Sequence, residues 1–494
     1  MSQTGSAEQF SSFSHGELVK ISTHLQQENE LLKFQFEELK KYVFGKRSEK
    51  QIPQSPEQEK LFALPERIQE PEYQEVKGYK KKKNSKKKIP ADLPVEQIIY
   101  EPQQSECEHC GEGLIEFSRD VRSELEFTPS RFFKKEHITL NCSCPKCKDV
   151  QSASAPAPVI AGTQLGPGLL AHILVNKFVD HLPYYRQSQI FEREGVYIPD
   201  KNLSRYGLAL GALLEPVAKA IKTEILESGY AQADETHINV LDHEKDSNSH
   251  RGQLWVLNDP HSKITYFEYH QGRDKDAASS LLGEFEGILQ TDAYTCYDNY
   301  SGTHLGCMAH ARRYFVKAKK LASKECHYII KLIAQLYAIE RDLTKQKVNF
   351  KRSAWFEHRR EIREEHSVPI LDKLKLYLIN IKDSWLLEKH PMYTAINYML
   401  NRFESFTIYT TDGRLQIDNN DIERMIRPVA IGRKNWMFSG SHHGASMSAV
   451  IFSVLQTCKA LKVNPQAYLT DVLPKLADLN TTSLDGLTPF DWSS

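Results

Sequence analysis

Two aspartates stand at strand positions where a carboxylate without a partner would be costly. Asp234 lies in the middle of the strand-like run AQADETH at 231–237, and Asp292 follows the apolar run GILQT at 287–291. A buried carboxylate is unfavourable unless a cation or hydrogen-bond donors meet it. Two such aspartates on neighbouring strands would form a hard-oxygen site, the kind that takes Mg²⁺ or Mn²⁺ together with water and substrate phosphate. For either aspartate alone, a strand-end or turn carboxylate without a ligand is the alternative.

A third carboxylate, Glu423, lies in the helix-like segment DNNDIERMIRP at 418–428. On a helix, Glu423 shares a face with Arg427, and Asn420 shares one with Arg424, because residues four apart are neighbours. The segment would therefore bring a metal-binding carboxylate and cationic side chains to one place. We expect those cations to hold a phosphate backbone.

Five of the nine cysteines fall between Cys107 and Cys147. Two CxxC turns, CEHC and CPKC, can each present two thiolates, and together they complete a tetrahedral zinc site of the Cys₄ type. The predicted ligands are Cys107, Cys110, Cys144 and Cys147. Cys142 is a spare thiol beside the second turn, so a site that uses it in place of Cys144 stays open. The cysteines could instead form a redox pair or remain as thiols without metal.

Composition limits the class of protein. The 494 residues suffice for two to four domains, and 64 Lys plus Arg balance 64 Asp plus Glu, so the whole chain has no basic excess. Positive charge is local: KKKKNSKKK at 80–88 could neutralise DNA phosphates or serve as a solvated linker. The sequence has no apolar run of about 18 residues and no signal-peptide pattern. We therefore expect no membrane segment, and an intracellular, reducing compartment that favours zinc over disulfides.

The elements that must position these residues follow in order along the chain. Leucines at 18, 25, 32 and 39 recur every seven residues, which predicts a coiled-coil helix over 15–47 with Asn29 setting its register. An amphipathic helix packed on its own chain is the alternative. Residues 48–94, rich in Gln, Glu, Lys and Pro, predict a basic disordered linker. The zinc-binding module is expected over 95–155.

Residues 165–227 have helical periodicity and predict a helix-turn-helix-like DNA-binding region, with Gly195 at the turn and Asp200 or Asn202 as a helix cap. From 228 the pattern changes to three strand-like runs, a short helix, another strand and a helix. We therefore expect an α/β catalytic domain over 228–440, interrupted by a helical insertion at about 316–400. Further helices should follow at 441–478, and the tail beyond them should be frayed.

Several blocks of the sequence resemble the transposases of the insertion sequence 66 family. They are DNNDIERMIRPVAIGRKNWMFSGS, ADETHINVL, QTDAY, CMAHARRYF, the FGKRSEK that ends the leucine heptads, the two CxxC turns and NKFVDHLPYYRQSQIFEREGV. The resemblance runs from about residue 18 to 473, with the blocks in the family's order. The extra cysteine of CSC, which overlaps the start of the second CxxC turn, departs from the pattern and leaves the zinc ligand set open.

The resemblance implies an α/β fold with a ribonuclease H-like catalytic core and a large helical insertion. It also implies a catalytic triad at Asp234, Asp292 and Glu423, which would hold two Mg²⁺ or Mn²⁺ ions for phosphoryl transfer to water or a 3′-hydroxyl. The implied activity is DNA transposition, by cleavage of the element's ends and strand transfer. The residues expected to clamp DNA phosphates near this site are His310, Arg312, Arg313, Arg424, Arg427, Arg433 and Lys434.

The implied partners are DNA, as terminal inverted repeats and target, a second copy of the chain in a homodimer or higher oligomer, and small accessory proteins of the same element. The implied location is the cytoplasm of a bacterium, at the nucleoid. An alternative from a different functional class is a DNA-binding regulator whose nuclease-like domain has lost activity. The retained carboxylates count against this alternative. A ribonuclease or Holliday-junction nuclease is the enzymatic alternative, and the zinc and coiled-coil front end counts against that.

Overall fold

The computed structural model describes residues 14–44, 132–137, 141–143, 150–152, 157–242, 244, 248–292, 295–385, 387–478 and 483–493. Helix α1 spans His15–Phe44. Two short antiparallel strands, β1 (Asn141–Ser143) and β2 (Val150–Ser152), lie in the segment predicted to bind zinc. The expected linker at 48–94 and the predicted zinc ligands lie outside the described residues; these ligands are Cys107, Cys110, Cys144 and Cys147.

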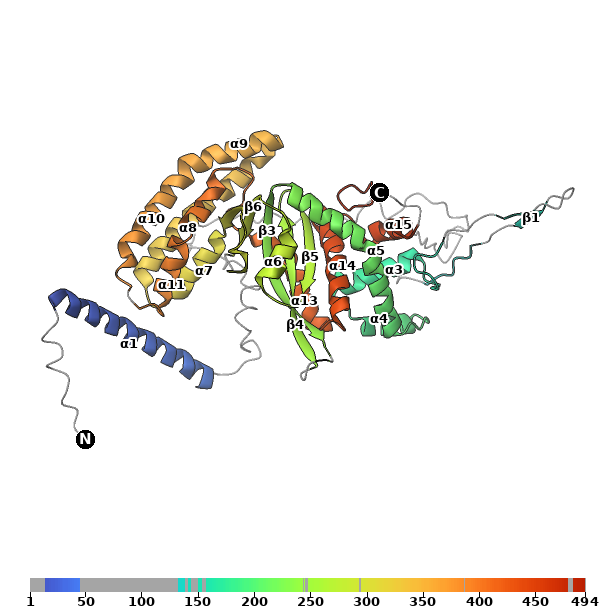
Figure 1. The fold of residues 1–494 in the computed structure, drawn as a ribbon, viewed down its shortest axis with the longest axis horizontal. Coiled ribbons are helices and arrows are strands. Elements are labelled where there is room, and N and C mark those ends of the chain that lie inside the picture. Colours follow the sequence, from blue (N-terminus) through green and yellow to red (C-terminus); the bar gives the residue numbers. More distant parts are fainter. Residues whose placement is uncertain are drawn as a thin grey trace, which may run out of the picture. The chain divides into compact units, whose positions relative to one another are not determined.

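A five-stranded mixed sheet organises the fold (Figure 1). Its strands are β3 (Tyr230–Leu241), β4 (Ser249–Asp259), β5 (Ile264–His270), β6 (Ile288–Thr291) and β7 (Thr303–Gly306), in the order β5-β4-β3-β6-β7. β3 pairs antiparallel with β4, and β4 with β5, whereas β6 and β7 continue the sheet parallel to β3. The predicted meander of three strands is confirmed, and β3, which carries Asp234, is the central strand.

The helices directly before the sheet are α3 (Pro167–Phe178), α4 (Tyr184–Arg193) and α5 (Asp200–Glu227). Gly195 has a φ of 84° in the turn between α4 and α5, as predicted, a conformation that glycine adopts without strain. The predicted helix cap is wrong. Pro199 occupies the N-cap of α5, and Asp200 is the first helical residue, where its carboxylate accepts from the Lys201 amide (2.8 Å). The φ of Pro199, which its ring fixes, brings the chain into the helix without a side-chain cap.

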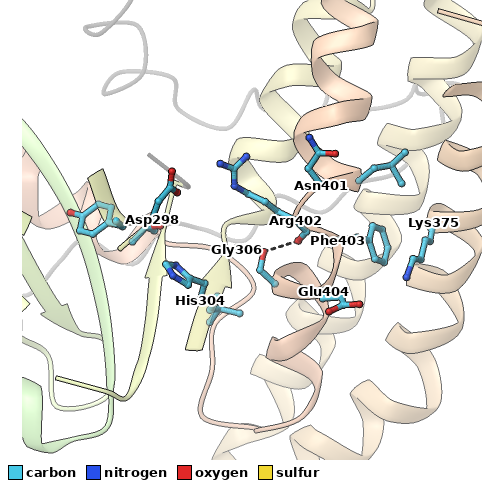
Figure 2. A pocket seen from close by; sticks show the side chains of 13 residues that line it. Asp298, His304, Gly306, Lys375, Asn401, Arg402, Phe403 and Glu404 are labelled. Atoms are coloured by element: carbon cyan, nitrogen blue, oxygen red, sulfur yellow. Dashed lines mark hydrogen bonds between the residues drawn. The ribbon is translucent and has the colours of Figure 1, made fainter. Parts of the chain in front are cut away.

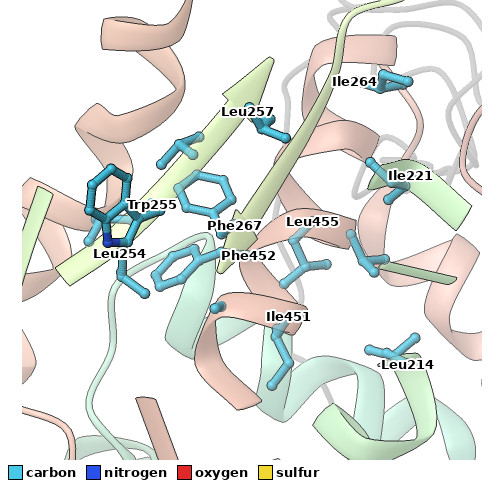
Figure 3. Close-up of a cluster of buried hydrophobic side chains, with 14 of the residues drawn as sticks. Leu214, Ile221, Leu254, Trp255, Leu257, Ile264, Phe267, Ile451, Phe452 and Leu455 are labelled. Atoms are coloured by element: carbon cyan, nitrogen blue, oxygen red, sulfur yellow. The ribbon is translucent and has the colours of Figure 1, made fainter. Parts of the chain in front are cut away.

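Helices that precede and follow the sheet in the sequence share one apolar core with it (Figure 3). Trp255 of β4 and Phe267 of β5 belong to this core, and the Phe267 ring lies 5.7 Å from that of Phe452 on α14 (His442–Leu461). Leu214 and Ile221 of α5 belong to the same cluster. α5 therefore supports the sheet, and the DNA-binding role of 165–227 stays a prediction.

A group of helices follows β7 in the sequence, before the chain returns to the sheet (Figure 1). They are α7 (Met308–Ala318), α8 (Ser323–Gln346), α9 (Arg352–Ile362), α10 (Val368–Lys382), α11 (Pro391–Leu400) and α12 (Phe403–Thr407). All of these except α9 contribute to a second apolar cluster, and a π-helical turn, Arg363–Ser367, joins α9 to α10. The chain then enters α13 (Asn420–Trp436), which packs on β3 and β4. We refer to α8–α12 as the insertion.

A buried ionic cluster fixes the loop by which the insertion returns to the sheet. Glu340 of α8 accepts from Arg359 (2.7 Å) and from Arg363 (2.7 Å), and all three side chains are buried. Arg363 also donates to the carbonyl oxygens of Tyr409 and Leu415 (2.6 and 2.9 Å). The carbonyl dipoles help to stabilise two guanidinium groups that share one carboxylate. The loop 409–416 is thus held on the insertion.

The C-terminal part contains α14 and α15 (Pro465–Ala477). Among the described helices, α14 is long and apolar enough to cross a membrane, but 61% of that stretch is buried in the fold, as expected for a core helix. The predicted fraying beyond 478 is wrong for 483–493. Tyr468 donates to the carbonyl oxygen of Leu487 (2.5 Å), and the Trp492 indole donates to Asp471 (2.9 Å). Leu487 and Trp492 supply apolar surface that packs on the core, although mostly polar residues surround them in the sequence.

Candidate functional site

A ladder of buried polar side chains crosses four strands of the sheet. Gln290 of β6 accepts from the Tyr230 hydroxyl (2.7 Å) and from Gln232 (2.9 Å), both on β3. Gln232 accepts from Asn258 of β4 (3.0 Å), which accepts from Thr265 of β5 (2.9 Å). The two glutamines also donate to the carbonyl oxygens of residues 416 and 418 (2.9 and 3.2 Å). Because buried polar groups keep their partners, the ladder fixes the segment that enters α13 on the sheet.

Asp234, Asp292 and Glu423 line one pocket of about 290 Å³. Gln232 of β3 lies opposite Gln290 of β6 in their parallel pairing. Continuing that register by two residues brings Asp234 beside Asp292, at the carboxyl end of β6. Glu423 reaches the pocket from the first turn of α13. The three carboxylates that the sequence predicted as a group thus come from a central strand, a strand end and a helix, and they line the same pocket.

The electrostatics of the pocket favour a cation. Burial raises the pKa of Asp234 well above its ordinary value of 3.8, and the carboxylates of Glu235, Asp292 and Glu423 raise it further. Burial likewise raises the pKa of Glu423, although Arg313 opposes this. A divalent cation would relieve this repulsion, and carboxylate oxygens are the ligands it prefers. Within the part of the chain that the structure describes, no three Asp, Glu, His or Cys side chains are grouped so as to hold one ion.

Guanidinium groups pair with Glu423 and Glu235 in the pocket. Nη2 of Arg313 donates to both carboxylate oxygens of Glu423 (2.6 and 2.8 Å), and Nη1 donates to Nε2 of His310 (2.7 Å). Nε of Arg273 donates to Glu235 (2.7 Å). His310 and Arg313, both predicted to contact DNA, therefore face a carboxylate of the site. Arg273 escaped prediction because it lies in a loop without a periodic pattern.

The other predicted phosphate contacts are half-buried or exposed: Arg312 on α7, and Arg424, Arg427, Arg433 and Lys434 on α13. Arg424 pairs with Asp421 one turn before it. Arg433 donates to the carbonyl oxygen of His237 in β3, so it ties α13 to the sheet. Helical spacing could not reveal that role, because the partner is a backbone atom distant in sequence.

Asp418, the first residue of DNND, has a structural role that the motif did not indicate. The Tyr337 hydroxyl of α8 donates to its Oδ2 (2.7 Å), and its Oδ1 accepts from the backbone amide of Asn420 (3.1 Å). Burial raises the pKa of Asp418 above its ordinary value. Asp418 thus joins the insertion to the first turn of α13, three residues before Asp421 and five before Glu423.

The insertion also reaches the second aspartate. The Tyr398 hydroxyl of α11 donates to the carbonyl oxygen of Asp292 (2.9 Å). A separate pocket of about 440 Å³ lies between the sheet edge and the insertion, with Asp298 and His304 on one side and Arg402 on the other (Figure 2). None of the three clustered carboxylates lines it. The insertion therefore shapes the surroundings of Asp292 while the carboxylates face a different cavity.

Comparison with known proteins covers most of the chain. The family described as Transposase IS66 family matches residues 162–447, which include all three carboxylates. Further matches are to Transposase C of IS166 homeodomain at 31–98, to the zinc-finger binding domain of transposase IS66 at 104–148, and to the IS66 C-terminal element at 453–490. The family resemblance predicted from the sequence is thus confirmed, as are the leucine-zipper and zinc-finger parts.

Similar proteins occur in Sinorhizobium fredii. The uncharacterized protein y4jD is 30% identical over 81% of this chain and 81% of its own length. The uncharacterized protein y4hP is 31% identical over 81% of this chain and 76% of its own length. No solved structure matches the chain. One family match spans more than half of the residues, and three further matches lie before and after it along the chain. This chain therefore belongs to the IS66 family of transposases.

Proposed function

We propose that this chain cleaves the ends of its insertion sequence and joins them to target DNA by metal-dependent phosphoryl transfer. The observation that carries the proposal is the meeting of Asp234, Asp292 and Glu423 in one pocket. Arg251, Arg273 and Arg313 line the same pocket and would offer positive charge to a DNA phosphate. Membership of the IS66 family supports the same activity.

We infer that the catalytic core is ribonuclease H-like. Three antiparallel strands are followed by two parallel ones in the order β5-β4-β3-β6-β7, which supports this assignment. The first aspartate lies on the central strand and the second at the end of the adjacent parallel strand. α13 supplies the third carboxylate after the insertion, which accounts for the long interval between Asp292 and Glu423.

The carboxylates of Asp234, Asp292 and Glu423 would hold two Mg²⁺ or Mn²⁺ ions. Bound there, such ions would supply activation of the attacking water or 3′-hydroxyl and would offset negative charge at the phosphorus. The chain's own contribution is to fix the carboxylates. The polar ladder holds the strands and the entrance to α13, and Tyr398 holds the backbone of Asp292. No protein nucleophile is required, because the attacking oxygen comes from water or DNA.

DNA contact would be shared between the site and the front of the chain. On α13, which carries Glu423, the exposed cations would contact phosphate. The zinc-finger match at 104–148 supports a structural zinc ion, for which we propose the ligands Cys107, Cys110, Cys144 and Cys147. The lysine run at 80–88 would add contacts that do not depend on base sequence. The protein would act where bacterial DNA is, in the cytoplasm.

Replacing the carboxylates tests this proposal. We expect Asp234→Asn, Asp292→Asn and Glu423→Gln each to lower Mg²⁺-dependent cleavage and strand transfer on end-containing DNA by roughly 10³-fold or more. The losses should not add, because a broken metal site can hardly be broken further. DNA affinity should stay nearly constant, since the phosphate contacts remain.

Glu235→Gln is the matched control. Glu235 lines the same pocket, but its carboxylate is paired with Arg273 and it is not a proposed metal ligand, so its loss should reduce cleavage far less. Equal losses at Asp234 and Glu235 would mean that the wrong carboxylate is assigned to the metal. Full activity in Glu423→Gln would refute the triad. A wild-type protein that binds the ends but leaves them uncut in Mg²⁺ and Mn²⁺ would instead be a DNA-binding regulator.

A further inference from the structure

The pairing of Arg313 with Glu423 conflicts with the role proposed for Glu423. One guanidinium nitrogen takes both carboxylate oxygens (2.6 and 2.8 Å), and the two side chains are only 24% and 18% exposed. An arginine nitrogen shared by both oxygens takes up two of the roughly four lone-pair sites of the carboxylate and competes with a metal ion for the same oxygens. A cation that binds both oxygens of Glu423 from this side can therefore do so only after the ion pair opens.

The arginine is itself held in place. Arg313 and His310 lie one turn apart on α7, and Nη1 of Arg313 donates to Nε2 of His310 (2.7 Å). A guanidinium has no acceptor, so this nitrogen of His310 must carry no proton. The imidazole thereby orients the guanidinium toward Glu423. The arrangement gives a half-buried carboxylate a counter-ion, without which it would be costly to bury.

We propose that Arg313 is a positioning residue that occupies the metal-ligand oxygens of Glu423 in the metal-free enzyme and is displaced when a divalent cation binds. The proposal rests on the function proposed above. One positive group replaces another at the same two oxygens, so Glu423 is never left buried without a cation. The displaced guanidinium keeps its charge at the pocket, where the scissile phosphate must lie.

A second arginine–glutamate pair in the same pocket provides a control. Arg273 is paired with Glu235 in the same pocket, yet Glu235 is not one of the proposed ligands. Removing either arginine lowers the positive charge of the pocket by the same amount. Only removal of Arg313 also frees the oxygens of a ligand. The two substitutions therefore separate competition for Glu423 from a general change in electrostatic potential.

The test measures Mn²⁺ binding to the zinc-loaded full-length protein without DNA, by the loss of the free-ion signal in electron paramagnetic resonance. We expect Arg313→Gln to bind Mn²⁺ about tenfold more tightly than the wild type, since a charge-assisted pair no longer has to be broken. Arg313→Lys, which keeps the charge but loses the planar fork, should show a smaller gain. Arg273→Gln should stay within about twofold of the wild type on the same scale.

Unchanged or weaker Mn²⁺ binding in Arg313→Gln would overturn the proposal, and so would an equal gain in Arg273→Gln. Should Arg313→Gln fail to fold, a crystal structure of the wild type with Mn²⁺ decides. The expected result is an Arg313 guanidinium withdrawn from Glu423, and a retained pair beside bound Mn²⁺ would contradict it. Asp292→Asn separates the two proposals. If it leaves Mn²⁺ affinity unchanged, the triad itself is wrong and the role of Arg313 falls with it.

Discussion

At Gly413 the packing between the insertion and the loop that leads to α13 leaves no room for a side chain. A Cβ at this position would overlap the carbonyl oxygen of Phe356 on α9. The carbonyl oxygen of Gly413 also accepts from Arg359 (3.0 Å), a member of the buried ionic cluster. Any side chain here must push α9 away from the loop that leads to α13, and the pairing of Arg359 with Glu340 would be strained with it.

We therefore expect Gly413→Ala to lower the free energy of unfolding by about 1–3 kcal/mol, the usual range for a forced shift in a packed region. A urea titration followed by tryptophan fluorescence would measure it. Gly166→Ala is the control, because a Cβ at Gly166 has no neighbour within 4 Å. Similar losses in both variants would show that close packing at 413 is not the cause.

At the same scale, the sequence singled out candidate residues where the residue type was itself unusual for its segment. Asp234 and Asp292 attracted notice because carboxylates are rare in apolar strands, and Glu423 because cations surround it. Arg273 and Tyr398 could not be found in this way. Each is ordinary in its segment, and its partner lies 38 residues away for Arg273 and 106 residues away for Tyr398. Only the folded chain brings these pairs together.

At the scale of the elements, Glu268 links three of them: β5, α5 and α6 (Lys275–Leu282). It lies on β5 and accepts from Lys222 of α5 (2.9 Å) and from His270 (2.8 Å), and Lys222 also donates to the carbonyl oxygen of Ser280 (3.2 Å) on α6. Burial alone would raise the pKa of Glu268, but the hydrogen bonds from His270 and Lys222 outweigh it and hold the pKa at about 2, below the ordinary 4.5. The ionised form of Glu268 therefore stabilises the packing of α5 and α6 on the sheet.

This depressed pKa gives a pH dependence with a definite sign. The contribution of Glu268 to stability is fully present above about pH 4.5 and is lost as the pH falls toward about 2. Glu268→Gln should lower the free energy of unfolding at neutral pH, and its difference from the wild type should shrink as the pH drops below 4.5. Urea titrations across that range would show it. The exposed Glu284→Gln should have little effect throughout, and a Glu268→Gln deficit that does not vary with pH would contradict the assignment.

Periodicity predicted the strands of the meander and most helices, because burial on one face leaves a clear record in the sequence. Periodicity did not predict which other elements those buried faces pack against. The apolar stripe of α5 indicated a buried helix, but a helix of the sheet's own core and one of a separate DNA-binding unit have the same stripe. The start of α5 was also missed, since the conformation of Pro199 replaced the expected side-chain cap.

At the scale of the whole molecule, α1 has features of both structures predicted from its sequence, a helix packed on its own chain and a coiled coil with a second copy. Gln27 and Leu31 are buried, and Gln27 donates to the carbonyl oxygen of Ser384 (2.7 Å), so one face meets the chain's own insertion. The heptad leucines at 25, 32 and 39 are 55%, 58% and 58% exposed on another face. A row of exposed leucines at this spacing suits a second copy of the helix.

We expect Leu25→Glu combined with Leu32→Glu to reduce self-association, because charges would enter the seam between paired helices. Light scattering of the full-length protein would report a lower molar mass. Gln26→Glu combined with Gln35→Glu adds the same charge on exposed positions beside the row and should preserve more of the assembly. An unchanged mass in the leucine variant would leave α1 as an intramolecular helix.

The packing of α14 on β5 also has a consequence for synthesis on the ribosome. The backbone amide of Phe267 donates to the hydroxyl of Ser453, 186 residues later. At roughly 5–20 residues per second, β5 leaves the ribosome on the order of ten to forty seconds before the helix that covers it. Glu423 is made in the same late interval, so a nascent chain has Asp234 and Asp292 but still lacks the third carboxylate of the proposed triad. A product ending before residue 423 would keep the zinc-finger segment and lack the third carboxylate. On the function proposed here, such fragments would bind the element's ends without cleaving them and so compete with the complete protein.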